Sequence, residues 1–132
     1  MLRYISLLIF LSLPLIAKVE SLTATEYERI CQGAVATLYP TPIDSIRVTK
    51  KAGGVVFLSY TRKSDGFLWN NKCRIEGSSI AWGNADGRWR THPQDEKLSF
   101  RVDRAAGTFT IRQAFADGSS DEKTFSFEAK PG

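Results

Sequence analysis

Residues 82–96 hold the densest collection of side chains that could do chemistry. This stretch contains two of the three tryptophans and the only histidine, together with two arginines and three acids. Tryptophan rings stack on sugar rings and other flat apolar surfaces, and guanidinium groups bind carboxylate or phosphate through paired hydrogen bonds. The composition therefore predicts a recognition surface. Its residues are Trp82, Arg88, Trp89, Arg90 and His92.

A purely structural role for the same residues is the competing interpretation. The two tryptophans would then be core residues, residues 91–93 would form a stiff corner, and the arginines would pair with nearby acids, Asp86, Asp95 or Glu96. A period of two through residues 88–90 places both arginines on one face and Trp89 on the other. If the segment is a recognition surface, the two arginines should line the rim of a groove, and a tryptophan should form its wall or floor. The sequence leaves both interpretations open.

His92 is the one candidate for general acid–base catalysis, with Asp95 or Glu96 to hold its tautomer. The sequence has no HExxH pair, no nucleophile elbow and no glycine-rich phosphate loop. A small hydrolase or lyase using His92 and nearby carboxylates therefore stays an alternative. The leading expectation is a protein with no enzymatic activity, no cofactor and no metal.

Other elements of the fold must position this segment, and the first of them along the chain is an amphipathic helix. Thr25 and Glu28 have the spacing of a capping box, in which each side chain bonds the other residue's backbone amide. Pro40 and Pro42 end the helix. Between them, apolar residues recur at helical spacing and form one stripe: Tyr27, Ile30, Cys31, Ala34, Val35 and Leu38.

The rest of the chain alternates apolar and polar residues with a period near two, which is typical of half-buried strands. Asp-Gly at 65–66 is a hairpin signal, because these residues adopt the positive φ values of tight β-turns. We expect strands at 43–49, 55–60, 67–76, 80–83, 88–90, 98–102 and 109–115, and a last one with Phe125 and Phe127. The fold class is α+β: an N-terminal helix packed on a twisted antiparallel β-meander of about six to eight short strands.

The two cysteines, Cys31 and Cys73, are predicted to form one disulfide. Cys31 lies in the apolar stripe of the helix, and Cys73 shares a strand face with Trp69 and Ile75. Because both faces point into the core, the bond would tie the helix to the sheet. Their spacing matches neither a zinc site nor a CxxC redox motif.

The start of the chain predicts export. Arg3 precedes an apolar run from Tyr4 to Ala17, and polarity returns at Lys18. This is the order of a signal peptide, assigned to residues 1–21 with cleavage between 17 and 24. A membrane anchor is the alternative, but the run is shorter than the roughly 20 apolar residues of a spanning helix. Residues 22–132 should form a single domain, periplasmic or secreted, with no stable membrane span after processing.

A set of motifs runs through most of the predicted mature chain. It consists of Tyr60, Trp69, Lys72-Cys73-Arg74, Glu76-Gly77, Trp82, Asp86-Gly87-Arg88-Trp89-Arg90, His92-Pro93, Asp95-Glu96, the stretch from Phe115 to Ser119, and Glu122-Lys123. In these motifs and their order, the chain resembles a group of short exported bacterial proteins of unassigned function. The resemblance implies a bacterial origin and a single domain, and it implies no activity, ligand or catalytic residue.

The leading functional hypothesis is a non-enzymatic binding module whose partner is a protein or an anionic glycan of the cell envelope. An inhibitor of an envelope hydrolase is the second hypothesis. The formal net charge of +4 favours anionic partners in general but is not itself a binding site. Basic residues are scattered, and solvated loops explain the pairs Lys50-Lys51 and Arg62-Lys63 better than a nucleic-acid patch does. The sequence does not indicate an oligomeric state.

Overall fold

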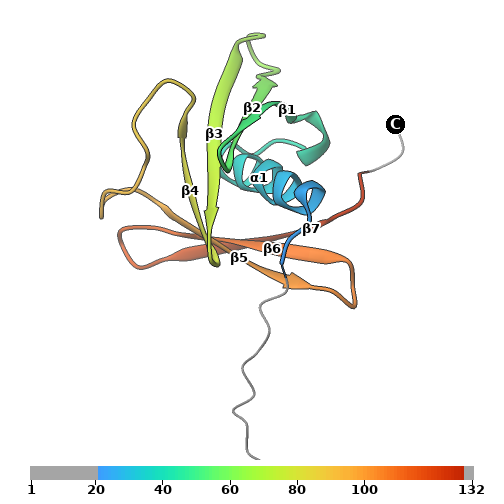
Figure 1. Cartoon of the computed structure of the whole chain (residues 1–132). Coiled ribbons are helices and arrows are strands. Elements are labelled where there is room, and N and C mark those ends of the chain that lie inside the picture. Colours follow the sequence, from blue (N-terminus) through green and yellow to red (C-terminus); the bar gives the residue numbers. More distant parts are fainter. Residues whose placement is uncertain (1–20, 130–132) are drawn as a thin grey trace, which may run out of the picture.

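The structure, a computed structural model, describes residues 21–129. A 15-residue helix, α1 (Ala24–Leu38), is followed by a short 3-10 helix, η1 (Ile43–Ser45), and then by strands only (Figure 1). The strands are β1 (Arg47–Ala52), β2 (Val55–Thr61), β3 (Leu68–Glu76), β4 (Ser79–Asn84), β5 (Lys97–Asp103), β6 (Thr108–Ala114) and β7 (Ser120–Ser126). Apart from Ser21, the predicted signal peptide lies outside the described residues.

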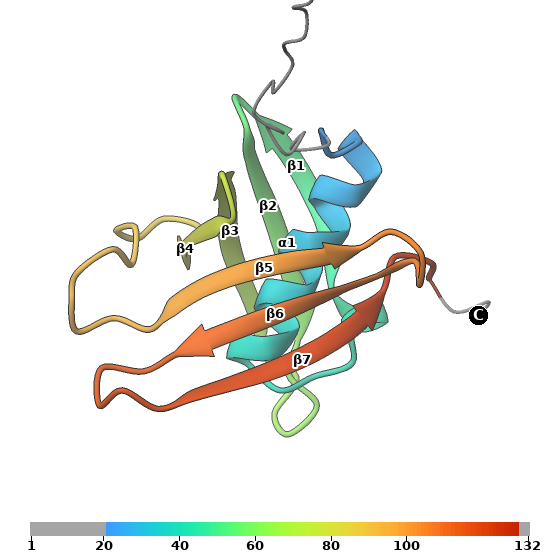
Figure 2. The same ribbon diagram turned by 90° about the horizontal axis from the view of Figure 1, so that it is seen from below.

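The seven strands form one antiparallel sheet whose spatial order is the order along the chain, β1 to β7. The sheet curls around α1, so that β1–β4 run behind the helix and β5–β7 cross it from another side (Figures 1 and 2). The predicted α+β meander is therefore confirmed. The helix is the first described element, but it begins at Ala24 rather than at the chain terminus.

The sheet has one weak seam, between β4 and β5. These strands share only two residue pairs, Ser79 with Ser99 and Ile80 with Leu98. All other neighbouring strands share five to seven pairs. Beyond Ile80 the two strands separate, and residues 85–96 form a long loop that leaves the sheet at this seam.

The core lies between α1 and the inner face of the sheet, and Phe109 of β6 is among its fully buried side chains. The Phe109 ring packs against Phe125 and Phe127, with ring centroids 5.5 and 4.9 Å away. Gly33 of α1 lies directly over it: a Cβ at this position would be 2.5 Å from Cε2 of Phe109. The helix therefore approaches β6 this closely only because residue 33 has no side chain.

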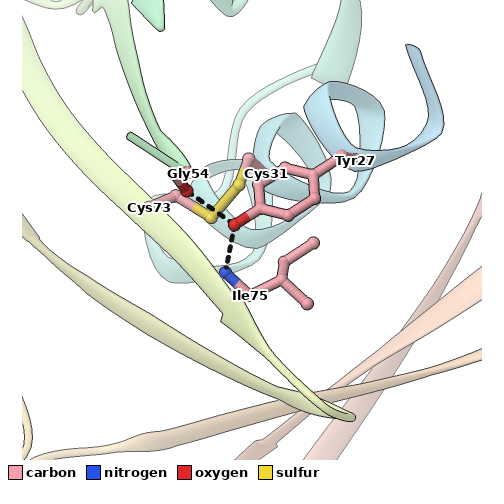
Figure 3. The surroundings of a disulfide bond; sticks show 5 residues. All are labelled: Tyr27, Cys31, Gly54, Cys73 and Ile75. Atoms are coloured by element: carbon pink, nitrogen blue, oxygen red, sulfur yellow. Dashed lines mark hydrogen bonds between the residues drawn. A yellow bond between two sulfur atoms is a disulfide. The ribbon is translucent and has the colours of Figure 1, made fainter. Parts of the chain in front are cut away.

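The predicted disulfide is present and joins α1 to β3 (Figure 3). Cys31 and Cys73 are both fully buried, and their Cα atoms are 5.8 Å apart. Beside the bond, the Tyr27 hydroxyl donates to the Gly54 carbonyl oxygen (2.6 Å) and accepts from the Ile75 amide (2.8 Å). The hydroxyl thus links the β1–β2 turn to β3, so that helix, turn and strand meet at one place.

The capping box was predicted two residues too late. The N-cap is Thr23, whose hydroxyl accepts from the Glu26 amide (3.1 Å), while the Glu26 carboxylate accepts from the Thr23 amide (2.9 Å). The sequence repeats the Thr-x-x-Glu spacing at Thr23 and at Thr25, so the motif alone does not choose between them. The earlier start puts Leu22 and Tyr27 at the two positions of a hydrophobic staple, and both pack against the core.

Replacing the two threonines separately tests this assignment. Thr23→Ala removes the acceptor for the Glu26 amide and should lower the free energy of unfolding by about 1 kcal/mol. Thr25→Ala changes only an exposed residue of the first helical turn and should leave stability nearly unchanged. Urea denaturation of both variants provides the measurement, and a larger loss from Thr25→Ala would contradict the cap.

The strand predicted at 43–49 was also wrong in its first half. Residues Ile43–Ser45 form a 3-10 helix, in which the Ser45 amide bonds the Pro42 carbonyl (3.0 Å) and the Ser45 hydroxyl bonds the same oxygen (2.6 Å). Proline, aspartate and serine all favour such turns. The turn also places Asp44 2.8 Å from the buried Arg29 of α1, an ion pair that an extended strand would not form there.

Candidate functional site

Asp95 organises the loop that contains the predicted recognition residues. Its carboxylate accepts two hydrogen bonds from the Arg88 guanidinium (2.8 and 3.0 Å) and one from the His92 backbone amide (3.0 Å). Arg90 adds an ion pair at 3.7 Å. The Asp95 side chain is only 10% exposed, whereas that of Arg88 is 58% exposed. One carboxylate thus holds three positions of the loop, and the Arg88 guanidinium is fixed while still facing solvent.

These contacts change the acidity of the groups involved. Hydrogen bonding from Arg88, helped by the His92 amide, holds the pKa of Asp95 at about 2, below its ordinary value of 3.8. The same hydrogen bond raises the pKa of Arg88. Because the pKa of Asp95 is lowered in the folded protein, its stabilising contribution is complete above its unfolded pKa and is lost as pH falls through about 2.

The loop should therefore stay anchored in mild acid. We expect NMR titration of the Asp95 carboxyl carbon to give a midpoint near 2 in the wild type. In Arg88→Ala the largest cause of the shift is removed, so the midpoint should move up towards about 4. Equal midpoints in the two proteins would show that Arg88 does not set the acidity of Asp95.

Trp89 lies on the outer face of the sheet, where two cations of β3 cover its ring. Lys72 Nζ is 4.6 Å and Arg74 Cζ is 4.3 Å from the ring centroid, within the range of cation–π attraction. Lys72 also donates to the Gly87 carbonyl (2.6 Å). We use the name Trp89 surface for Trp89, the two cations that cover its ring, Lys72 and Arg74, and the two arginines beside it in the loop, Arg88 and Arg90.

The loop can lie this close to β4 because of Gly83. A Cβ at this position would be 2.5 Å from the backbone carbonyl oxygen of Arg88. The Arg90 amide donates to the Trp82 carbonyl (2.7 Å) on the same strand. The loop backbone therefore follows β4 where β5 has separated from it. Residues 88–90 are nevertheless not a strand, which corrects the sequence prediction: the single bond to Trp82 is not continued into a ladder.

Trp82 is a core residue, in contrast to Trp89. Its side chain is 8% exposed and belongs to the buried cluster on the inner face of the sheet. Its indole N–H donates to the Glu96 carbonyl (3.3 Å), and the Glu96 carboxylate accepts from Gln113 of β6 (2.6 Å). Arg90 lies over the Trp82 ring at 5.4 Å. Trp82 thus positions Arg90 and the end of the loop.

A groove of about 210 Å³ opens beside Arg90, where β4 and β5 separate. Its lining combines charged and hydroxyl side chains over an apolar floor that includes Ile80 and Leu98. The polar lining residues are Glu76, Ser79, Arg90, Thr91, Glu96, Lys97 and Ser99. Of the two arginines predicted at a groove rim, Arg90 lines this groove, and neither tryptophan does.

His92 is exposed at the corner of the loop. Its ring Nδ1 accepts from the Gln94 backbone amide (3.1 Å), so a neutral ring carries its proton on Nε2. The expected role of Asp95 in holding the ring was wrong, because Asp95 bonds the backbone of His92 instead. The Glu96 carboxylate bonds Gln113. No cluster of three or more metal-ligating side chains occurs within residues 21–129.

Sequence reasoning missed Lys72 and Arg74 as members of the Trp89 surface. A signal was present: both flank Cys73, so a strand that buries the cysteine turns these two cations to the outer face. Nothing in the sequence, however, indicates that Trp89 folds back over β3.

In the part of the chain that the structure describes, the helix lacks the length and apolar character needed to cross a membrane. No protein-family model, curated protein or solved structure matches the chain.

Proposed function

We propose that the protein is an exported, non-enzymatic binding module whose Trp89 surface holds an anionic group of a cell-envelope glycan. The observation that carries the proposal is the charge balance around Trp89. Lys72 and Arg74 cover the Trp89 ring, and Arg88 and Arg90 are its neighbours in the chain. The ion pairs of these four cations use two carboxylates, Glu76 and Asp95. Such an excess of positive charge on one fixed surface attracts carboxylate or phosphate groups.

The arrangement of the cations suits recognition as well as attraction. Arg88 is oriented by its paired bonds to Asp95 and has further N–H donors that face solvent. Lys72 and Arg74 are held against the Trp89 ring. Cations that are already ordered lose less conformational entropy when a ligand binds, and this preorganisation raises affinity.

The buried disulfide supports the export part of the proposal. A structural disulfide persists in oxidising compartments such as the periplasm or the extracellular medium. The predicted signal peptide points to the same compartments. A protein partner, including an envelope hydrolase that the chain would inhibit, is the competing outcome. A strongly cationic hydrolase is disfavoured as a target because the net positive charge of the protein would repel it.

Binding to an acidic polysaccharide tests the proposal. Alginate oligomers supply carboxylates on a sugar chain, and dextran is the neutral control. We expect the disulfide-bonded protein to bind alginate in microscale thermophoresis, with affinity that falls as salt increases. Lys72→Ala with Arg74→Ala should abolish this binding and leave the thermal midpoint within a few degrees, because both side chains lie on the outer face.

A charge-matched variant makes the test specific. Arg101→Ala with Arg112→Ala removes the same number of positive charges from exposed positions on β5 and β6. It should retain alginate binding. Equal losses in the two double variants would indicate general charge attraction and would contradict the proposed site. Binding to neither polysaccharide, together with capture of one envelope protein, would favour the inhibitor hypothesis.

A further inference from the structure

A pocket outside the Trp89 surface lies at the β1 edge of the sheet. Its volume is about 240 Å³, and it is formed by η1 together with the first three strands. The lining combines hydroxyl groups with one cation and one exposed apolar side chain. The lining residues are Ser45, Arg47, Ser59, Tyr60, Thr61 and Leu68. None of them belongs to the Trp89 surface, so the role of this pocket is a separate question.

The register of β1 and β2 brings the cation of this pocket next to a buried serine. Arg47 pairs directly with Ser59, and side chains paired in this way lie on the same face of the sheet with Cβ atoms about 5 Å apart. Thr61 follows Ser59 by two residues, so its hydroxyl group is on that face as well. The other face of β2 carries the core residues Leu58 and Tyr60. One guanidinium and two hydroxyl groups therefore gather on the outer face of the sheet.

These three side chains make no polar contact with one another or with the rest of residues 21–129. Seven arginines of the described chain pair with a carboxylate, but Arg47 does not. The hydroxyl groups of Ser59 and Thr61 form no hydrogen bond there either. Ser59 is only 5% exposed, and a polar side chain so enclosed normally has a hydrogen-bond partner. The pocket thus offers one positive charge and two hydroxyl donors to a ligand.

We propose that Arg47, Ser59 and Thr61 bind the terminal phosphate of a small phosphomonoester. The planar guanidinium of arginine binds two oxygen atoms of such a group through paired hydrogen bonds, and each hydroxyl group donates one more. A terminal phosphate has three oxygen atoms that accept these bonds, whereas a carboxylate has two. The pocket has room for more than a phosphate, and Leu68, 53% exposed, forms an apolar wall for the rest of the ligand.

Titration of the disulfide-bonded protein with glycerol phosphate, followed by amide NMR spectra, tests this proposal. The signals of Ser59 and Thr61 should shift and reach saturation. Arg47→Ala should weaken binding about tenfold or more, because paired charge-assisted hydrogen bonds are lost. Arg47→Lys keeps the charge but not the planar fork and should recover only part of the affinity. Ser59→Ala should weaken binding about fivefold, and Arg112→Ala, which removes an exposed arginine from β6, should leave it unchanged.

Two further ligands test the recognition of a terminal phosphate. Inorganic phosphate should compete for the same site, whereas glycerophosphoglycerol, a diester with two free oxygen atoms, should bind more weakly than glycerol phosphate. Equal affinities for the monoester and the diester would overturn the proposal, and so would the absence of saturable shifts at Ser59 in the wild type. Equal losses in Arg47→Ala and Arg112→Ala would overturn it as well, because they would indicate general charge attraction. The result is independent of alginate binding, since the Lys72/Arg74 double variant should bind glycerol phosphate like the wild type.

Discussion

Removing the disulfide should cost the protein about 4 kcal/mol of stability. The bond closes a loop with a sequence separation of 42 residues, and in the chain-entropy description a loop of this length contributes about 4 kcal/mol by restricting the unfolded chain. Replacing Cys31 and Cys73 together with alanine should therefore lower the urea midpoint strongly. The thermal midpoint should fall by on the order of 15 °C, given the usual unfolding entropy of a domain of about 100 residues.

Reduction of the wild type provides the matching control. Protein unfolded, reduced and alkylated at both cysteines should fail to recover the stability of the oxidised form on refolding. The Tyr27 hydroxyl bridge to Gly54 and Ile75 would still be available to the alanine variant. A double alanine variant within 1 kcal/mol of the wild type would therefore show that packing and this bridge, and not the covalent link, hold α1 to the sheet.

Phe109→Ala should have an effect of similar size by a different physical route. The ring is fully buried, touches the rings of Phe125 and Phe127 and lies against Gly33. Its removal leaves a cavity between α1 and β6, and such changes cost about 4 kcal/mol. Chemical denaturation monitored by far-UV circular dichroism gives the free energy of unfolding directly.

Phe67→Ala is the control for this prediction, because it removes the same ring from an exposed position. It should change the free energy of unfolding by less than about 1 kcal/mol. Comparable losses from the two substitutions would mean that Phe67 is buried in solution, which would contradict its exposure in the structure.

The strands were predictable because the meander is built from local signals. Alternation between inner and outer face is regular along β3, and Asp65-Gly66 marks the turn before it. The prediction of the helix was wrong only at its first residues, because Thr23 and Thr25 both fit the same capping motif. The choice between them depends on Leu22 reaching the core, which is a tertiary contact.

The candidate site was less predictable, because its residues depend on contacts between distant parts of the chain. The sequence predicted that Arg88 and Arg90 would share one side and Trp89 the other. Both arginines do reach Asp95, while Trp89 turns to β3. The partners of Trp89 are Lys72 and Arg74, and their contact with it follows from the path of the loop over Gly83. No local pattern encodes that path.

The weak seam between β4 and β5 has a consequence for how the molecule opens. Two residue pairs are too few to couple β1–β4 to β5–β7 through backbone hydrogen bonds alone. The helix provides the coupling, since its Cys31 is bonded to β3 and its Gly33 lies against Phe109 of β6. If α1 left the sheet, β1–β4 would therefore separate from β5–β7, and each group would keep the hydrogen bonds between its own strands. We therefore expect the two halves of the sheet to unfold together only while α1 is packed against both of them.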